Sequence, residues 1–357
     1  MNAPSYAGAA VPMSAAPHGV SGKLFIAAAG LLALLVFMAI RSLGGGYYFV
    51  AAFSILQYMV LATAWNILGG YAGYINFGSA AFFSIGAYSS VFFYKYLGVQ
   101  TLGALSLGFM TVDAPYVPYL ITLFALVMGA AIAGLVGLGT GYLSLRLRGV
   151  FFAISTLALA VVFQTIVVNW AYVGGARGAY VMKPKVIAGF ANGTEFAFAA
   201  MLVLTVLAVA IARHLENSRT GAGLEAIRDD ELSAETAGVP TLRLKLIATS
   251  LSGALMGAAG SLFPFFVTYV DPVGAFSLVH TVNSIAMPLI GGMTSWLGPV
   301  LGAILLGTVQ QYFNTNSFIT PELGLLFVGV LMMVFVAVAP NGILGLLERH
   351  GMRKKKQ

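Results

Sequence analysis

Apolar runs long enough to cross a lipid bilayer recur along this sequence, and they constrain its fold more than any other feature. The first run covers residues 24–40 and is bracketed by Lys23 and Arg41. Only helices and closed barrels satisfy every backbone hydrogen bond inside a bilayer, and a helix needs about 20 apolar residues to span it. Because 59% of the residues are hydrophobic and 8% are charged, a soluble domain is excluded. We therefore expect an all-α, polytopic integral membrane protein.

About ten transmembrane helices are predicted, some of them short or interrupted. They cover residues 24–40, 47–68, 73–97, 119–145, 150–172, 196–212, 246–270, 282–290, 300–312 and 323–339. Lys and Arg concentrate in alternate connections and near the carboxyl terminus, which by the positive-inside rule places both termini in the cytoplasm. We expect a disordered tail over residues 1–22, a transmembrane domain over 23–345 and a basic tail over 346–357.

Several classes of protein are excluded or disfavoured by residue type. The chain has no cysteine, so thiolate chemistry and Cys-based metal sites are excluded, and its four histidines show no ligand spacing. The net charge is +7, but the basic residues flank the apolar spans, and this distribution does not indicate nucleic-acid binding. The predicted spans contain no Asp or Glu, which disfavours a membrane enzyme and weakens the case for an ion-coupled transporter. We expect no catalytic residues, no metal and no cofactor, and an energy source outside this chain.

Two glycine-rich reversals interrupt the apolar pattern, one at residues 69–78 and one at residues 291–302. Broken or re-entrant helices that line a path are one interpretation. The other is close helix packing, because pairs such as Gly253 and Gly257 have the small-xxx-small spacing that lets helix backbones approach. The packing interpretation is favoured, and the glycines alone do not establish a path.

Neutral polar residues inside the predicted spans are the candidates for lining a translocation path. Amides that face lipid are unfavourable, so these residues either border a path or bridge helices by hydrogen bonds, and bridging is the more common role. The candidates are Asn66, Asn76, Ser79, Gln164, Asn169 and Asn283.

One long polar segment, residues 213–245, separates the two sets of spans and falls on the cytoplasmic side. Within it, residues 227–240 predict a short helix, because Asp229 or Asp230 can cap its start and Gly238 can end it. A helix this short is marginal in water, so we expect it to dock against another surface. A solvated loop helix is the alternative interpretation.

Four stretches together resemble one family of transporters. They are residues 66–88 (NILGGYAGYINFGSAAFFSIGAY), 145–158 (LRLRGVFFAISTLA), 226–239 (AIRDDELSAETAGV) and 291–302 (GGMTSWLGPVLG). Over residues 46–345 the chain resembles the LivM-type permeases of ATP-binding-cassette importers for branched-chain amino acids. It departs from the family pattern at Tyr74 and Ser79, where relatives often carry Gln and His.

The resemblance implies a permease of a bacterial-type inner membrane that hydrolyses nothing itself. Its implied partners are a second homologous permease of the LivH type, two cytoplasmic ATP-binding subunits and an extracytoplasmic substrate-binding protein. The implied substrates are leucine, isoleucine and valine. Urea, short amides or other amino acids are alternatives, and an ion-coupled secondary transporter is the runner-up. The implied contacts to the ATPase are Arg228, Asp229, Asp230, Glu231, Glu235 and Gly238.

Overall fold

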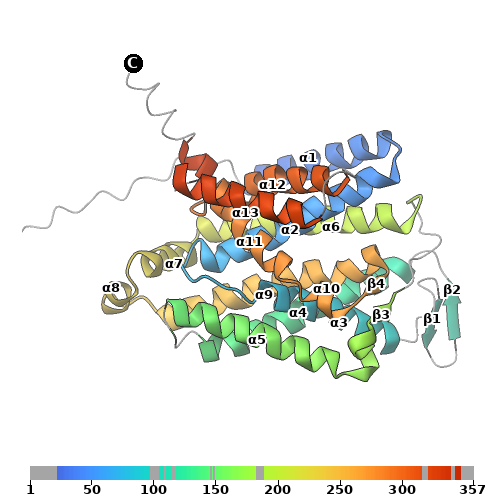
Figure 1. Ribbon diagram of the computed structural model, residues 1–357, viewed down its shortest axis with the longest axis horizontal. Coiled ribbons are helices and arrows are strands. Elements are labelled where there is room, and N and C mark those ends of the chain that lie inside the picture. Colours follow the sequence, from blue (N-terminus) through green and yellow to red (C-terminus); the bar gives the residue numbers. More distant parts are fainter. Residues whose placement is uncertain are drawn as a thin grey trace, which may run out of the picture.

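The structure, a computed structural model, is built almost entirely of helices, as the all-α prediction requires (Figure 1). It describes residues 22–96, 104–107, 110–113, 117–144, 147, 149–181, 189–315, 321–338 and 342–346. The predicted tails lie outside the described residues, except for Gly22, which begins the first helix, and Leu346.

Seven helical segments are long and apolar enough to cross a membrane in the part of the chain that the structure describes. They are α1 (Gly22–Ser42), α2 (Gly46–Gly69), α4 (Val117–Ser144), α5 (Val150–Val168), α6 (Gly193–Glu216), α9 (Thr241–Val267), and α10 (Pro272–Ala275) together with α11 (Leu278–Gly291). The predicted ten spans are reached only if three more helices also cross the membrane: α3 (Ser79–Tyr96), α12 (Leu297–Thr315) and α13 (Pro321–Val338), which have 18, 19 and 18 residues. The predicted class, a helical multi-pass membrane protein, is confirmed.

The two ends of the helix bundle carry different structures (Figure 1). Helices α7 (Arg219–Asp229) and α8 (Glu231–Thr236) lie at one end, which we call the α8 end. Short antiparallel strand pairs lie at the other, the β4 end: β1 (Ala104–Leu107) with β2 (Met110–Asp113), and β3 (Ala179–Tyr180) with β4 (Tyr269–Val270). The pair β3–β4 ties two short 3₁₀ turns, Ala171–Val173 and Gly175–Arg177, to the end of α9. Strands of two to four residues are too short to show an alternating pattern, so the sequence did not predict them.

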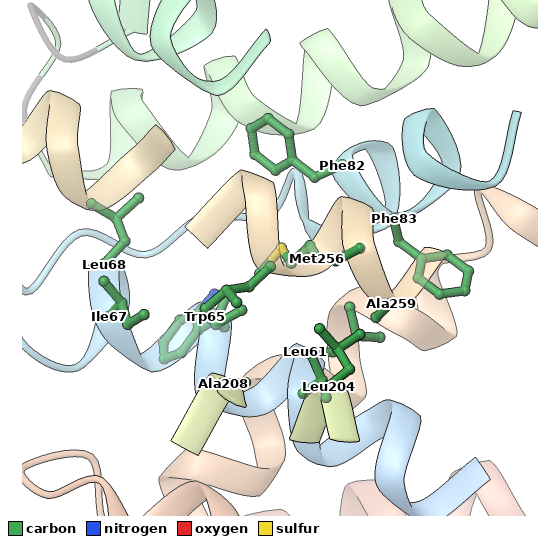
Figure 2. Close-up of a cluster of buried hydrophobic side chains, with 14 of the residues drawn as sticks. Leu61, Trp65, Ile67, Leu68, Phe82, Phe83, Leu204, Ala208, Met256 and Ala259 are labelled. Carbon is green, nitrogen blue, oxygen red and sulfur yellow. The ribbon is translucent and has the colours of Figure 1, made fainter. Parts of the chain in front are cut away.

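Helices α2 and α9 form the centre of the bundle. Helix α2 packs against α6, α9, α11 and α12, while α9 packs against α2, α3, α4 and α6. Leu61 and Trp65 of α2 meet Met256 of α9 in a fully buried cluster, with Phe83 of α3 beside them (Figure 2). Burying a large apolar side chain stabilises the fold by about 1.5–3 kcal/mol in water, but in a bilayer the gain comes mainly from close packing.

Close helix packing explains most of the glycines inside the bundle. A Cβ added at Gly86 of α3 would lie 1.9 Å from the carbonyl oxygen of Gly257 in α9. A Cβ added at Gly260 would lie 1.8 Å from the carbonyl oxygen of Phe83. Backbones this close leave no room for any side chain, so the packing interpretation of these glycines is confirmed.

The chain between α2 and α3 is not helical. Residues 70–78, which we call the extended segment, return from the α8 end into the bundle before α3 begins at Ser79 (Figure 1). The prediction of a helix from residue 73 is therefore wrong by six residues, whereas the prediction of an interrupted span is confirmed. Non-helical backbone at this depth is tolerated because its polar groups find partners within the protein, as described below.

Two predictions about acidic residues are corrected by the structure. Helix α6 begins at Gly193, three residues earlier than predicted, and so contains Glu195, which is only 2% exposed. The statement that the spans contain no acidic residue is therefore wrong. The single helix predicted over residues 227–240 is in fact the end of α7 followed by α8, because Asp230 breaks the helix and caps the second one.

Candidate functional site

Residues 217–240 form a helical hairpin at the α8 end, made of α7 and α8 and called the coupling hairpin below. Helix α7 ends at Asp229, and Asp230 caps α8: its Oδ1 accepts from the backbone N–H groups of Leu232 at 2.9 Å and Ser233 at 3.0 Å. These hydrogen bonds, that of Ser233 foremost, hold the pKa of Asp230 below its usual range. Of the two predicted capping residues, the structure selects Asp230.

Helix α8 ends as predicted, with Gly238 in the left-handed region at φ +85°. The N–H of Val239 donates to the carbonyl of Ala234 and that of Gly238 to the carbonyl of Glu235, both at 3.0 Å, which is the Schellman pattern. A Cβ added at Gly238 would meet nothing within 4 Å. A side chain here would therefore strain the backbone without causing a clash.

A groove of about 580 Å³ opens on the surface of the coupling hairpin. Mostly small side chains line it, so the backbone of another chain can approach closely. Its lining residues are Arg219, Thr220, Ala222, Gly223, Ala226, Ala237, Gly238, Val239, Pro240 and Leu244. Gly238, one of the implied ATPase contacts, lies on this groove beside Ala237.

Arg228 connects the coupling hairpin to the extended segment. One terminal nitrogen donates to the carbonyl oxygen of Gly70 at 3.2 Å, and the other contacts Glu225 Oε1 at 3.1 Å. A Cβ added at Gly73 would lie 3.1 Å from the Arg228 side chain and 3.5 Å from its Cα. Because the guanidinium is planar and carries five donors, it holds the two backbones in a defined relation.

A second connection is a buried ionic cluster of three residues. Glu231 of α8 accepts a hydrogen bond from Tyr74 of the extended segment and pairs with Lys245 of α9, whose Nζ lies 2.6 Å from Oε1. Lys245 Nζ also lies 3.2 Å from the Tyr74 hydroxyl. The side chain of Lys245 is 3% exposed and that of Glu231 is 15% exposed. Glu231 was expected to face a partner, but its carboxylate turns inward and fixes α8 to two membrane segments.

Glu216, at the end of α6, joins both glycine-rich reversals at the α8 end. Its Oε2 accepts from the backbone N–H of Trp296 at 2.6 Å and from the hydroxyl of Tyr71 at 3.2 Å. The side-chain amide of Asn66 donates to the carbonyl of Ser295 at 3.4 Å, beside the same junction. The reversals around residues 70 and 293 are far apart in the sequence but are therefore in contact in the structure.

Two of the acidic residues expected at the ATPase contact do point outward. The side chain of Asp229 is largely exposed and lies 3.6 Å from Arg228 Nε. Glu235 accepts from the hydroxyl of Thr241 at 2.8 Å, which links α8 to the start of α9. Among the described residues, no three His, Asp or Glu side chains lie close enough to hold a metal ion.

Side chains of the extended segment alternate between the protein interior and an open face. Tyr74 and Asn76 are buried, whereas Gly73, Ile75 and Phe77 are exposed. This alternation follows from extended backbone, in which successive side chains point to opposite sides. The exposed face of the segment is therefore apolar, and the polar side chains face inward.

Polar groups from neighbouring helices hold the extended segment in place. The N–H of Phe77 donates to Thr156 Oγ1 of α5 at 3.1 Å. The Thr281 hydroxyl of α11 donates to the carbonyl of Phe77 at 3.4 Å and accepts from the N–H of Ala80 at 3.2 Å. Trp65 Nε1 donates to the carbonyl of Asn76 at 2.8 Å. The segment is thus fixed by α2, α5 and α11 together.

The structure brings three path candidates together and separates the rest. Asn66, Asn76 and Ser79 are all buried at the extended segment, and Asn76 Oδ1 accepts from the N–H of Gly78 at 2.7 Å. Asn283 is buried elsewhere, between α11 and α12, and accepts from Gln310 at 2.7 Å. Asn66 and Asn283 therefore bridge distant segments, Asn76 bonds within the extended segment, and Ser79 Oγ meets no hydrogen-bond partner in the part of the chain that the structure describes.

Gln164 and Asn169 lie on α5, away from the other path candidates. Asn169 is exposed, and its amide donates to the carbonyl of Thr165 in its own helix at 2.8 Å. Helix α5 buries only Phe152, Thr156 and Val167 against the bundle. Nothing in this arrangement brings Asn169 to the extended segment.

Sequence reasoning missed Tyr74, Lys245, Glu216 and Thr281 as site residues. Lys245 was not distinguished, because it directly precedes the predicted span 246–270, where the positive-inside rule expects basic residues. Glu216 and Tyr74 carried no signal, since their partners lie 80 and 157 positions away in the chain. Such contacts depend on the tertiary arrangement of the helices.

Comparisons with known proteins agree with this arrangement. The family described as "Branched-chain amino acid transport system / permease component" matches residues 47–336. The chain is 27% identical to the high-affinity branched-chain amino acid transport system permease protein LivM of Salmonella typhimurium, over 91% of this chain and 75% of that protein. It is 24% identical to a probable LivM of Methanocaldococcus jannaschii (80% of this chain, 90% of that one). It is also 27% identical to a probable LivH of the same organism (42% and 48%).

No solved structure matches the chain. The match to the family nevertheless covers most of the sequence and includes both glycine-rich reversals, the extended segment and the coupling hairpin. With its membrane-spanning helices, the chain is a multi-pass membrane protein and a transport subunit. It belongs to the family of permease components of branched-chain amino acid transport systems.

Proposed function

We propose that this chain is the permease subunit of an ATP-binding-cassette importer that carries leucine, isoleucine and valine across the inner membrane. The observation that carries the proposal is the attachment of the coupling hairpin to the extended segment through Arg228 and through the cluster of Tyr74, Glu231 and Lys245. An ATPase that moves the hairpin would thereby move non-helical backbone inside the membrane. The names of the relatives, which are branched-chain amino acid transport permeases, support the substrate class.

The proposed mechanism is alternating access driven by displacement of the hairpin. A partner ATPase binds the groove on α7 and the outward carboxylates Asp229 and Glu235. Rigid-body motion of the coupling hairpin reaches Tyr74 through Glu231 of α8, and reaches Gly70 through Arg228 of α7. Packed elements switch between discrete arrangements, so a small displacement at the hairpin repositions the whole extended segment.

The apolar face of the extended segment favours branched-chain substrates over urea or short amides. Ile75 and Phe77 are exposed on it. A narrow cavity of about 10 Å³, room for about one water molecule, lies at the same segment and is lined by Asn76, Thr140 and Thr156 together with apolar side chains such as Leu159 and Phe163. Aliphatic side chains suit the exposed face of Ile75 and Phe77, whereas urea would leave its polar groups unpaired there.

The proposed orientation places the α8 end, both termini and the ATPases in the cytoplasm, and the β4 end toward a substrate-binding protein. A second permease of the LivH type and two ATP-binding subunits complete the complex. Because the native chain has no cysteine, single cysteines report sidedness against a clean background. Ala234, an obvious reporter from the sequence, is buried, so the exposed Leu232 on α8 and Tyr180 on β3 are better positions.

We expect Tyr180→Cys to react with an impermeant maleimide in intact cells and Leu232→Cys to react only after lysis. Labelling of Leu232→Cys from outside would overturn the orientation. The transport function is tested in proteoliposomes that contain the full complex, by comparing ATP-dependent uptake of labelled leucine with that of labelled urea. Uptake of urea but not leucine would contradict the proposed substrate class. Uptake in the absence of the ATP-binding subunits would contradict the proposal of an ATP-driven importer.

A further inference from the structure

Helix α1 contacts the bundle along one stripe of partly buried side chains, which includes Ala33, Phe37 and Ile40. At the α8 end Phe25 packs edge-on against Trp296, with ring centroids 5.0 Å apart. Near the β4 end Phe37 stacks on Phe198 of α6 at 6.0 Å. None of the residues of α1 is buried, and α1 precedes the residues 47–336 that match the family. Helix α1 therefore lies on the surface of the bundle and leaves a groove beside it.

The carboxyl end of α1 carries the one ion pair that the structure shows for this helix. Arg41 Nε lies 3.4 Å from Glu195 Oε1. The Glu195 side chain is 2% exposed, while that of Arg41 is 49% exposed. Glu195 Oε2 accepts from the N–H of Ala191 at 2.8 Å, so the carboxylate is fixed in the first turn of α6. Arg41 thus lies half in contact with a buried anion and half open to the surroundings.

An apolar groove of about 590 Å³ lies between α1 and α6. Aliphatic side chains line its length, including Ile26, Ala33 and Leu34 from α1 and Leu202, Val203 and Val206 from α6. Among the described residues of its wall, Arg41 is the single charged one, and it lies at the end nearest the β4 end. The α1 residues that line the groove extend from position 26 to position 41, or about 22 Å at 1.5 Å per residue.

We propose that this groove binds one phospholipid molecule, with an acyl chain lying along α1 and the phosphate on Arg41. A groove that opens at membrane depth borders hydrocarbon, and an unfilled groove would lose the dispersion contacts that packed atoms make. One leaflet of the bilayer core is about 15 Å thick, so a chain from the leaflet at the β4 end fits the groove length. The ligand is thereby a phospholipid and not a water-soluble anion.

The geometry at Arg41 suits a phosphate. The contact to Glu195 is made by Nε, and the guanidinium carries two terminal nitrogens besides, each of them a donor suited to phosphate. Arg recognises phosphate oxygens through such paired donors, more specifically than Lys does. A long cationic side chain at a helix end also reaches the headgroup level readily. Glu195 in this arrangement orients Arg41 and does not touch the lipid.

The test fills the groove without disturbing the helix. A Cβ added at Gly30, which lines the groove, would meet nothing within 4 Å, and leucine is a better helix former than glycine. Gly30→Leu should therefore fold and occupy the space of the acyl chain. Gly139→Leu on α4 is the matched control, since Gly139 is exposed and its added Cβ also meets nothing.

The full chain is purified in mild detergent, and bound phosphatidylglycerol is counted by native mass spectrometry. We expect the wild type and Gly139→Leu to retain one phospholipid more than Gly30→Leu. Glycerol 3-phosphate alone should not displace that molecule. Equal retention by wild type and Gly30→Leu would overturn the proposal, as would displacement by glycerol 3-phosphate. In the assembled complex, release of another subunit by Gly30→Leu with unchanged lipid would show that a protein helix occupies the groove and would also overturn it.

The proposed contact between Arg41 and the lipid phosphate is tested by separate variants. Arg41→Gln combined with Glu195→Gln removes both charges and leaves no orphan carboxylate. It should weaken phosphatidylglycerol binding about tenfold, because one charge-assisted contact is lost. Glu195→Gln alone should keep near wild-type binding, since it retains Arg41. Unchanged binding in the double variant would overturn the role of Arg41.

Discussion

Replacing Lys245 with methionine should uncouple ATP hydrolysis from transport. Methionine keeps the length and the apolar stem of lysine but leaves the Glu231 carboxylate without its cationic partner. The variant thereby tests whether the cluster of Tyr74, Glu231 and Lys245 holds α8 to the extended segment. Arg243→Met, two residues away on an exposed position of the same helix, is the matched control.

The expected size of the effect follows from burial. Removing one partner of a buried ion pair costs about 3–5 kcal/mol, because the other charge is left uncompensated. The lower end applies, since Glu231 is 15% exposed and keeps the hydrogen bond from Tyr74. We expect Lys245→Met to lower the free energy of unfolding by about 3 kcal/mol. Adding Glu231→Gln removes the orphan charge and should recover about 2 kcal/mol of that loss.

Two measurements check this prediction. Unfolding by sodium dodecyl sulfate in mixed micelles gives the free-energy changes for Lys245→Met, for the double variant and for Arg243→Met. Proteoliposomes with the complete transporter give the number of ATP molecules hydrolysed per leucine imported. We expect Lys245→Met to raise that ratio several-fold and Arg243→Met to leave it unchanged. If Lys245→Met and the double variant lose the same stability and keep the wild-type ratio, the ionic cluster does not transmit motion.

Substitutions at three further positions test other parts of the account. Gly238→Val should abolish receptor-stimulated ATP hydrolysis while the chain still reaches the membrane, because the left-handed backbone costs an L-residue about 1–2 kcal/mol and more when it is β-branched. Gly238→Asn should retain stimulation, because asparagine tolerates this backbone. Full stimulation of ATP hydrolysis in Gly238→Val would show that the coupling hairpin takes no part in the mechanism. Phe77→Ala should raise the half-saturating leucine concentration for uptake, because the apolar face of the extended segment is lost, and an unchanged value would mean that this face does not line the path. Asn169→Leu should leave uptake unchanged, since Asn169 bonds only within its own helix in the described residues, and a loss of uptake would return it to the path.

Local chemistry made parts of the candidate site predictable. Gly238 was predictable as a helix end because glycine adopts the left-handed backbone without steric cost and is followed shortly by Pro240. Asp230 was one of two predicted caps. The sequence did not decide between Asp229 and Asp230, because the capping residue depends on where the preceding helix ends. The apolar runs predicted the helices well, but not the start of α3, because the sequence of the extended segment is as apolar as that of a helix.

The connections between segments were not predictable in the same way. The contact of Glu231 with Tyr74 joins residues 157 positions apart, and that of Asn66 with Ser295 joins residues 229 positions apart. No local periodicity encodes such pairs. The sequence also suggested that Asn76 faces a path, whereas extended backbone turns Asn76 inward and exposes Ile75 and Phe77. The side that a residue faces depends on its secondary structure, and the sequence predicts a helix for residues 73–78, where the structure has non-helical backbone.

The claim that the coupling hairpin and the extended segment move as one unit is tested most directly by a reversible disulfide. A Cβ added at Gly73 would lie 3.6 Å from the Cβ of Arg228, within the range of about 3.5–4.5 Å found in disulfides. In a double variant with cysteine at both positions, the reduced protein has lost the Arg228 contact, and leucine uptake should be low. Oxidation replaces that contact by a covalent bond and should restore uptake, with neither single variant responding to oxidant. Uptake that falls further on oxidation and recovers on reduction would show that the two segments separate during transport, contrary to the account.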